Sequence, residues 1–347
     1  MSPVARRHHT VPRFYLDAFA RDGQIGTVEL PGVKRFVQSV RYAATMNNFY
    51  SLDTPDPGDS DTFEAALGAF EGVVAPIIRS VVQEDTWPLP PEQRRALAEF
   101  AVVQHLRGPD QRRAMEQIMA ATTKIELSIA GREHLFGYAR EHLGREVSEA
   151  EADMLWEQVI SPTGPPITLS PRGHIEQIIE AVPDFTKYIL GRPWVLVRFD
   201  RKKLFTCDTP VALLPDPQSP PVQGIGLINA WSLTLPLARS VGLMMIDPIP
   251  FVDHLRFEDV AQGQADTREP PTSRLANMFN HATARNARRW IFHHPDDSSL
   301  IGNELPPPRT TEISFSGAST DFVDMGARIR ANRTDGHGNP AADGGLL

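Results

Sequence analysis

Apolar side chains recur three or four positions apart over long stretches of this chain, which is the spacing of one face of a helix. Residues 63–81 show the pattern clearly and predict a helix that begins at Asp61 or Thr62. Pro76 lies inside this segment, so we expect a kink or a break there. The preceding residues 53–61, rich in proline and aspartate, are expected to form a solvent-exposed loop.

Further helices are predicted from start and stop signals. Proline or serine opens several of them, and Gly108-Pro109 and Gly191 each end one. They are expected from Pro90-Pro91 to Gly108-Pro109, over Asp110–Ala130, from the capping box Ser148-Glu-Ala-Glu151, from Ser170-Pro171 to Gly191, and over about Ser273–Phe292.

Short β-favouring segments lie near the beginning of the chain and again after Trp194. Gln24–Leu30 and Arg35–Val40 flank the turn signal Pro31-Gly32, and Trp194–Phe199 with Lys203–Thr206 resembles a hairpin. Other candidates are Val211–Leu214, Trp231–Leu235, Val241–Ile246 and Thr311–Phe315. The pattern predicts an α+β protein with a largely helical N-terminal half and a smaller antiparallel β element in the C-terminal half.

The order of these elements predicts one domain over residues 1–330. We divide it into a mainly helical subdomain, 1–192, and a mixed β/α subdomain, 193–330. Residues 331–347, rich in glycine and without aromatic residues, are expected to form a disordered tail.

Composition narrows the class of protein. The chain has 347 residues, 41% of them hydrophobic, which is enough for a sizeable core and excludes disorder of the whole chain. One cysteine cannot form an internal disulfide, so a secreted disulfide scaffold is excluded. The net charge of −8 argues against extensive nucleic-acid binding. We find no leader-like apolar region and no long apolar span, so a cytoplasmic protein without a membrane partner is expected.

Known catalytic motifs are missing: the sequence has no P-loop, G-x-G-x-x-G, H-E-x-x-H, C-x-x-C or G-x-S-x-G. The chain opens instead with His8-His9-x-x-Pro12-x-x-Tyr15-Leu16-x-x-Phe19. An imidazole can bind a metal or transfer a proton. Adjacent residues of a strand point in opposite directions, however, so one metal rarely takes both histidines. Phe14, Leu16 and Phe19 are expected to pack in the core.

Two candidate groups lie on the predicted helices. Glu64 and Glu71 are two turns apart. The helix dipole accounts for Glu64 in the first turn, but Glu71 in mid-helix needs a partner such as an arginine or a metal. Gln104 and Arg107 share a helix face. Arg107 either offsets the dipole at the helix end or binds a carboxylate or phosphate in a cleft.

Two more candidates follow in the C-terminal half. Asp208 stands where a strand runs into Asp-x-Pro, a position that suits a catalytic or metal-binding carboxylate and equally the start of a turn. Its neighbour Cys207 has no evident basic partner, so a nucleophilic role is not favoured. Asn280 lies on the late helix, followed by arginines that are expected to form a solvated face or, less favourably, an anion site.

Taken together, these motifs resemble the bacterial family known as domain of unknown function 4238. The opening motif is followed in the same order by Asn48-Phe49-Tyr50, the Glu64/Glu71 helix, Gln104–Pro109, Thr206–Val211, Pro236-Leu237 and the Asn280 helix. Gly108 and Cys207 stand where the family often has threonine and serine. The resemblance, over about residues 6–293, implies a soluble bacterial protein of a single unit, and it implies no particular reaction.

Two functions remain open from the residues alone. His8, His9, Glu71, Gln104, Arg107, Asp208 and Asn280 would suit hydrolysis if they converge on one cleft. In a phosphodiesterase or nuclease used as a toxin or in phage defence, His9 would be the general base and Arg107 would bind the phosphate. A divalent metal ion would have Glu71, Asp208 and His9 as candidate ligands. Alternatively, the same residues form a buried polar network in a non-catalytic ligand-binding or interaction module.

Overall fold

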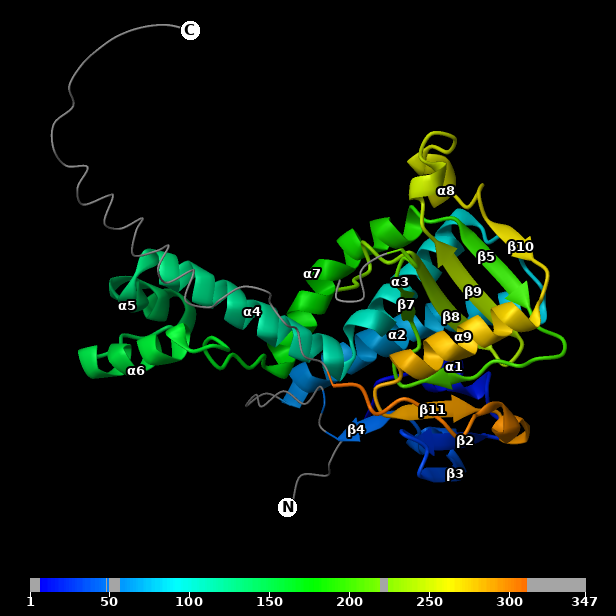
Figure 1. Cartoon of the computed structure of the whole chain (residues 1–347), viewed down its shortest axis with the longest axis horizontal. Coiled ribbons are helices and arrows are strands. Elements are labelled where there is room, and N and C mark those ends of the chain that lie inside the picture. Colours follow the sequence, from blue (N-terminus) through cyan, green and yellow to red (C-terminus); the bar gives the residue numbers. More distant parts are fainter. Residues whose placement is uncertain (1–6, 48, 50–56, 219–223, 311–347) are drawn as a thin grey trace, which may run out of the picture. The chain divides into compact units, whose positions relative to one another are not determined.

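The computed structural model describes residues 7–47, 49, 57–218 and 224–310, and the fold is α+β (Figure 1). The chain forms two compact units, one from Met1–Arg112 with Ser170–Thr310 and one from Arg113–Leu169 with Thr311–Leu347. The subdivision expected at residue 192 falls inside the first unit. The expected strand Thr311–Phe315 and the expected tail 331–347 lie outside the described residues.

Helices of the first unit begin largely where the sequence signals predict. They are α1 (Arg13–Asp17), α2 (Pro57–Gln83), α3 (Pro91–Leu106), α7 (Pro171–Leu190), α8 (Phe257–Ala261) and α9 (Ser273–Asn286). The hydroxyl of Ser170 accepts the N–H of Gly173 and caps α7, which ends at Gly191 as expected. The helix α4 (Pro109–Ala130) starts directly after the predicted break at Gly108.

The helix α2 differs from the expectation in two ways. It begins at Pro57, within the segment expected to be a loop, and it continues through Pro76 without a break. A proline removes one backbone donor, and a long helix held by neighbours on either side of the proline tolerates that loss. By length and composition alone, Ala65–Gln83 (mean hydropathy 1.6) could cross a membrane, a test that core helices of soluble proteins also pass.

A five-stranded sheet forms the centre of the first unit, in the order β10 (Thr267–Glu269), β5 (Trp194–Arg198), β9 (Val241–Ile246), β8 (Ser232–Ala238) and β7 (Ala212–Leu214). Only β10 and β5 are parallel among these pairs. Every residue of β8 is buried, so both faces of the sheet are covered there. Figure 1 shows α9 along one face, where Phe279 packs with Val197 and Phe199.

A second sheet has four strands, all antiparallel, in the order β3 (Lys34–Ser39), β2 (Gln24–Glu29), β11 (Trp290–His293) and β6 (Thr206–Cys207). The predicted hairpin of β2 and β3 is confirmed. A separate pair joins β1 (Arg7–His9) to β4 (Thr45–Asn47).

Two sequence predictions in this region are wrong. The predicted hairpin between Trp194–Phe199 and Lys203–Thr206 does not form, because β9 and β10 occupy both edges of β5 and the chain crosses to the other sheet. The predicted helix Ser273–Phe292 ends at Asn286, and Trp290–His293 is a strand. The carboxylate of Asp208 accepts the N–H groups of residues 288–290, and this fixes the turn between α9 and β11.

A buried arginine ties α3 to the segments around β5. Arg94 donates from Nε and Nη2 to both oxygens of Asp266 at 2.8 and 2.9 Å, and both side chains are 0% exposed. Its guanidinium also lies 4.1 Å from the ring centre of Trp194. The remaining donors bind the carbonyls of Leu190, Arg192 and Ala261. One side chain thereby fixes the ends of α7 and α8 next to the sheet.

The second unit is helical over its described residues, 113–169. The helices α5 (Leu135–Tyr138) and α6 (Glu149–Ile160) pack with α4 around Leu127, Leu135 and Val159. The predicted capping box at Ser148 is confirmed on one side, because its hydroxyl accepts the N–H of Glu151.

Candidate functional site

Arg107, at the C-terminal end of α3, is the centre of the first polar cluster. Its side chain is 1% exposed, and its nitrogens donate to three acceptors within the chain. Nε donates to the carbonyl of Thr10 at 2.6 Å, Nη2 to that of His9 at 3.3 Å, and Nη1 to Oε1 of Glu71 at 3.1 Å. The guanidinium therefore joins α3, α2 and the end of β1.

Glu71 has the partner that its mid-helix position required. Its side chain is 26% exposed and forms an ion pair with Arg107, so of the two partners that were expected, an arginine or a metal, the structure shows an arginine. The side chain of Glu64, two turns earlier, lies outside the described part of the structure.

Gln104 and His9 carry buried polar atoms near this ion pair. Gln104 lies one turn before Arg107 in α3 and is 3% exposed, yet neither its Oε1 nor its Nε2 has a hydrogen-bond partner among the described residues. Nε2 of His9 is also buried and has no partner in the part of the chain that the structure describes. A buried polar atom without a hydrogen bond lowers the stability of the fold. Such atoms therefore mark a place where a bound water or ligand would supply the missing hydrogen bonds.

The imidazole of His9 is held in its neutral form at pH 7. Burial lowers its pKa below the usual value, and the positive charges of Arg107 and Arg13 lower it further, against a hydrogen bond with the backbone of Arg41 that raises it. His8, the preceding residue of β1, is 4% exposed. Because adjacent residues of a strand point to opposite faces, the rings of His8 and His9 are not expected to share one ligand.

The opening motif has mainly a packing role. Leu16 and Phe19 are 0% exposed, as expected for core residues, whereas Phe14 is only half-buried. Tyr15, for which no core position was expected, is 0% exposed as well. The hydroxyl of Tyr15 bonds to the hydroxyl of Thr206 and donates to the carbonyl of Pro236, so α1 is linked to both sheets. Burial raises the pKa of this phenol well above its usual value.

Asp208 belongs to a second cluster, separate from the bonds of Arg107. Its Oδ1 accepts the N–H of Arg288 at 2.8 Å, and its Oδ2 accepts those of Arg289 and Trp290 at 2.9 and 3.0 Å. Burial raises the pKa of Asp208 to about 6, against these three hydrogen bonds, and the nearby charge of Asp110 adds to the rise. This carboxylate is directed at the chain's own backbone.

Asn280 and Cys207 are also engaged with backbone groups. Asn280 accepts the N–H of Phe205 at 3.2 Å and donates to the carbonyl of Lys203 at 3.0 Å, so its amide joins α9 to the segment before β6. The Cys207 thiol is buried and lies 3.2 Å from the carbonyl of Thr209. Burial raises its pKa to about 12, and a thiol in this state is not a nucleophile at neutral pH.

The family model described as a protein of unknown function, DUF4238, matches residues 7–297. The chain belongs to this family. No curated protein and no solved structure matches it. The hydrogen bonds of Arg107 and of Asp208 in this DUF4238 protein are formed between residues of the matched region.

Among the described residues of the DUF4238 chain, no group of three His, Cys, Asp or Glu side chains is arranged to hold a metal ion. The candidate ligands Glu71, Asp208 and His9 do not form such a group. Glu71 pairs with Arg107, and Asp208 accepts backbone N–H groups, so each carboxylate is already compensated within the protein. We therefore assign no metal-dependent step to these three residues.

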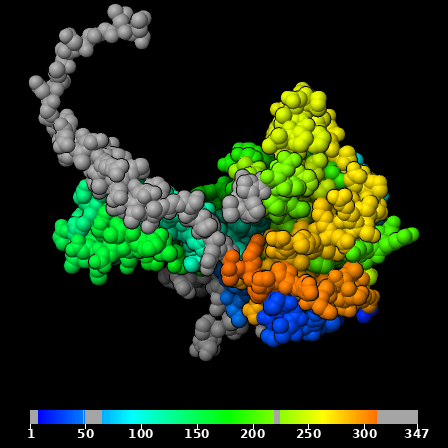
Figure 2. All heavy atoms as spheres, viewed as in Figure 1, coloured from blue at the N-terminus to red at the C-terminus, as the bar shows by residue number. Residues whose placement is uncertain are grey.

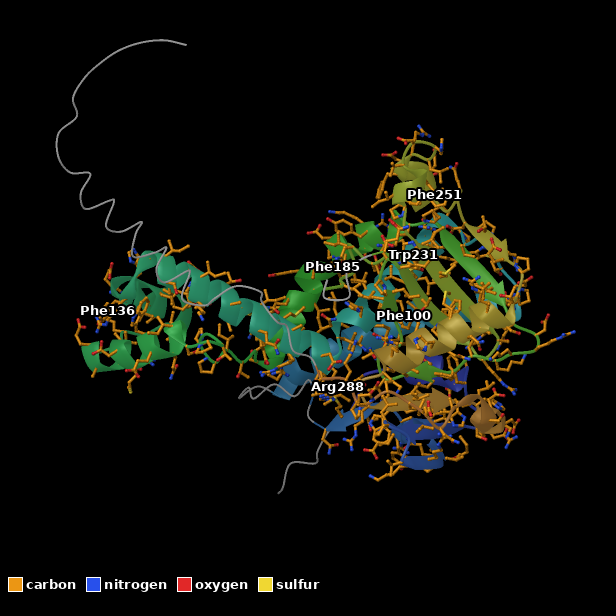
Figure 3. All side chains as sticks on the ribbon, viewed as in Figure 1. Phe100, Phe136, Phe185, Trp231, Phe251 and Arg288 are labelled. Carbon is orange, nitrogen blue, oxygen red and sulfur yellow. The ribbon has the colours of Figure 1, made fainter. Side chains whose placement is uncertain are left out.

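Sequence reasoning missed the residues that surround Asp208. Asp110, in the first turn of α4, accepts from Nε of Arg288 at 2.8 Å and from Nη2 of Arg309 at 2.6 Å. Arg309 also donates to Oδ1 of Asn286 at 3.1 Å. The only signal in the sequence was an acidic residue after Gly108-Pro109, which the helix dipole alone explains. Figure 3 labels Arg288 where α9 gives way to β11.

Proposed function

We propose that this DUF4238 protein is a non-catalytic ligand-binding or interaction module, and that its His/Glu/Arg/Asp network holds the fold in shape. The observation that carries the proposal is the orientation of the guanidinium of Arg107. Its Nε, Nη1 and Nη2 atoms all donate to the chain itself, and 1% of the side chain is exposed. A phosphate or carboxylate ligand needs donors that are free to reach it.

The second cluster supports the same proposal. Asp208 accepts backbone N–H groups, and Asn280 binds backbone groups at both ends of its amide. Side chains that satisfy main-chain groups in this way specify a turn or a helix position. A structural network of this kind explains why these positions carry Asp and Asn, and it requires no catalytic role for them.

Turnover tests this proposal. The purified chain is incubated with bis(p-nitrophenyl) phosphate, single-stranded RNA and single-stranded DNA, with and without Mg²⁺ or Mn²⁺, beside the His9→Gln and Arg107→Lys variants. We expect either no hydrolysis or a background rate that neither substitution abolishes. Hydrolysis that His9→Gln removes while the variant stays folded would contradict the proposal and establish an enzyme.

One observation favours a second candidate, a hydrolase with His9 as general base. The neutral imidazole has an unpaired Nε2, and the unpaired amide of Gln104 is on the helix that carries Arg107. In such an enzyme Nε2 would accept the proton of an attacking water, and Gln104 would orient that water. The pH profile separates the two candidates, because the base would require activity to rise through a pKa below the usual value for histidine.

A further inference from the structure

A large groove lies between the C-terminal end of α7, the 3-10 helix η4 (Ile249–Phe251) and α8. Its volume is about 1020 Å³, which is sufficient for a small organic molecule. None of the site residues discussed above lines it. Figure 2 shows the η4–α8 segment as a lobe of the first unit, and Figure 3 labels Phe251 within it.

The lining is aromatic and apolar, and much of it is exposed. Tyr188, Val252 and Phe257 are 47%, 63% and 53% exposed, and Phe251 and Val260 complete the apolar surface. Large apolar side chains on a concave surface are typical of a ligand site.

Phe257 is held in place by a close approach to α7. A side chain at Gly191 would come within 2.7 Å of the Phe257 ring, so the aromatic wall depends on glycine at this position. The groove thus has the end of α7 and the ring of Phe257 from α8 close together on one side.

The groove lining has two acidic side chains, Asp184 and Asp253, and two basic ones, Lys187 and Arg256. Lys187 pairs with Asp184 at 2.7 Å, and Arg256 pairs with both oxygens of Asp259 at 2.8 and 2.9 Å. Because Arg256 pairs with Asp259 outside the lining, Asp253 is left without an ion-pair partner among the described residues. The C-terminal end of α7 adds the negative pole of the helix dipole.

Other charged or titratable groups lie close to the groove. Arg192, between two groove residues, is 2% exposed and donates to the carbonyls of Leu227 and Ile228, away from the lining. The charge of Asp247 acts on this guanidinium and opposes it, so the two add no net charge beside the groove. His254 lines the groove as well.

We propose that this groove binds a small amphipathic cation, a ligand with an aromatic or aliphatic body and one ammonium group. The apolar body would contact Val252 and Val260. The ammonium would lie against the faces of Tyr188 and Phe257, within reach of the charge of Asp253. This inference names the class of ligand that the proposed binding module would take, and it rests on the proposed function in that respect alone.

The test uses three probes of equal length that differ in charge: 4-phenylbutylammonium, 4-phenylbutanol and 4-phenylbutyrate. Their dissociation constants are measured on the full chain by ligand-observed NMR titration at pH 7 and low salt. We expect the cation to bind at least threefold more tightly than the alcohol, and the anion to bind most weakly. Equal or tighter binding of the anion would overturn the proposal.

Two variants with matched controls locate the site. Asp253→Asn should weaken binding of the cation about two- to fivefold and leave the alcohol unchanged, whereas Asp200→Asn, at an exposed turn, should change neither. Phe257→Ala should weaken all three probes, and Phe36→Ala, exposed on β3, should not. Cation binding that survives Phe257→Ala overturns the site. These binding results are independent of turnover, so the failure of one proposal is distinguishable from the failure of the other.

Discussion

Replacing Arg94 with methionine would test the energetics of the buried clamp between α3 and the sheet. Methionine keeps most of the apolar volume and removes the guanidinium. Among the described residues, the carboxylate of Asp266 would keep one donor, the N–H of Trp194 at 3.0 Å. The carbonyls of Leu190, Arg192 and Ala261 would lose the guanidinium as their partner. A buried charge without its partner typically costs about 3–5 kcal/mol.

We expect Arg94→Met to lower the free energy of unfolding by about 4 kcal/mol, a large part of the roughly 5–15 kcal/mol that stabilises a typical domain. The assay is urea unfolding followed by tryptophan fluorescence, which includes Trp194 beside the clamp. The control is Arg95→Met, because Arg95 is the next residue of the same helix and is exposed. The control should change stability by less than about 0.5 kcal/mol.

The double variant Arg94→Met/Asp266→Asn sharpens this test. Because it removes the stranded charge as well, its loss of stability should be smaller than the sum of the two single losses. A loss below about 1.5 kcal/mol in Arg94→Met, or a loss equal to that of Arg95→Met, would refute the reasoning.

Three further predictions concern single side chains. The pKa of Asp208 is raised to about 6, so between about pH 4 and pH 6 the folded state holds a proton that the unfolded state has lost. The free energy of unfolding should therefore fall as pH rises through this window, by at most about 1.4 kcal/mol per pH unit. In urea titrations, Asp208→Asn should abolish that slope. The Cys207 thiol should not react with a thiol reagent at pH 8 unless the protein is unfolded in guanidinium, and rapid labelling of the folded chain would contradict its burial. Tyr15→Phe should cost about 1–2 kcal/mol in thermal unfolding because two buried hydrogen bonds are lost, whereas Tyr188→Phe, at an exposed tyrosine, should cost almost nothing.

Local signals in the sequence were sufficient to predict where most helices lie. Prolines at the starts of α3 and α7, the serine caps of α6 and α7, and the break at Gly108 act within a few residues of the elements they define. The hairpin of β2 and β3 is also local, and it was predicted for the same reason.

Strand pairing over long distances could not be predicted in this way. The strand β5 pairs with β9 and β10, and β11 enters the four-stranded sheet beside β2, which lies more than two hundred residues earlier. The helical pattern after Ser273 gave no sign of the turn at 288–290, because that turn is fixed by a carboxylate from Asp208. A contact of this kind leaves no periodicity in either segment.

The candidate site was predictable in part. A carboxylate in mid-helix needs compensation, and this argument predicted an arginine or a metal as the partner of Glu71. The partner in the structure is Arg107. The backbone partners of Asp208 could not be inferred, since any three N–H groups of the chain would serve equally well. The pairing of Asp110 with Arg309 was missed for the same reason, because the two lie far apart in the sequence.

The measurement that tests the central claim most directly compares Arg107→Met with Arg95→Met in urea unfolding. If the polar network holds the fold, Arg107→Met should lose about 3 kcal/mol, because two backbone carbonyls and the Glu71 carboxylate lose their shared donor, while Arg95→Met should stay within about 0.5 kcal/mol of the parent chain. An Arg107→Met variant as stable as the parent chain would contradict the account and show that this guanidinium is kept for a ligand or a reaction.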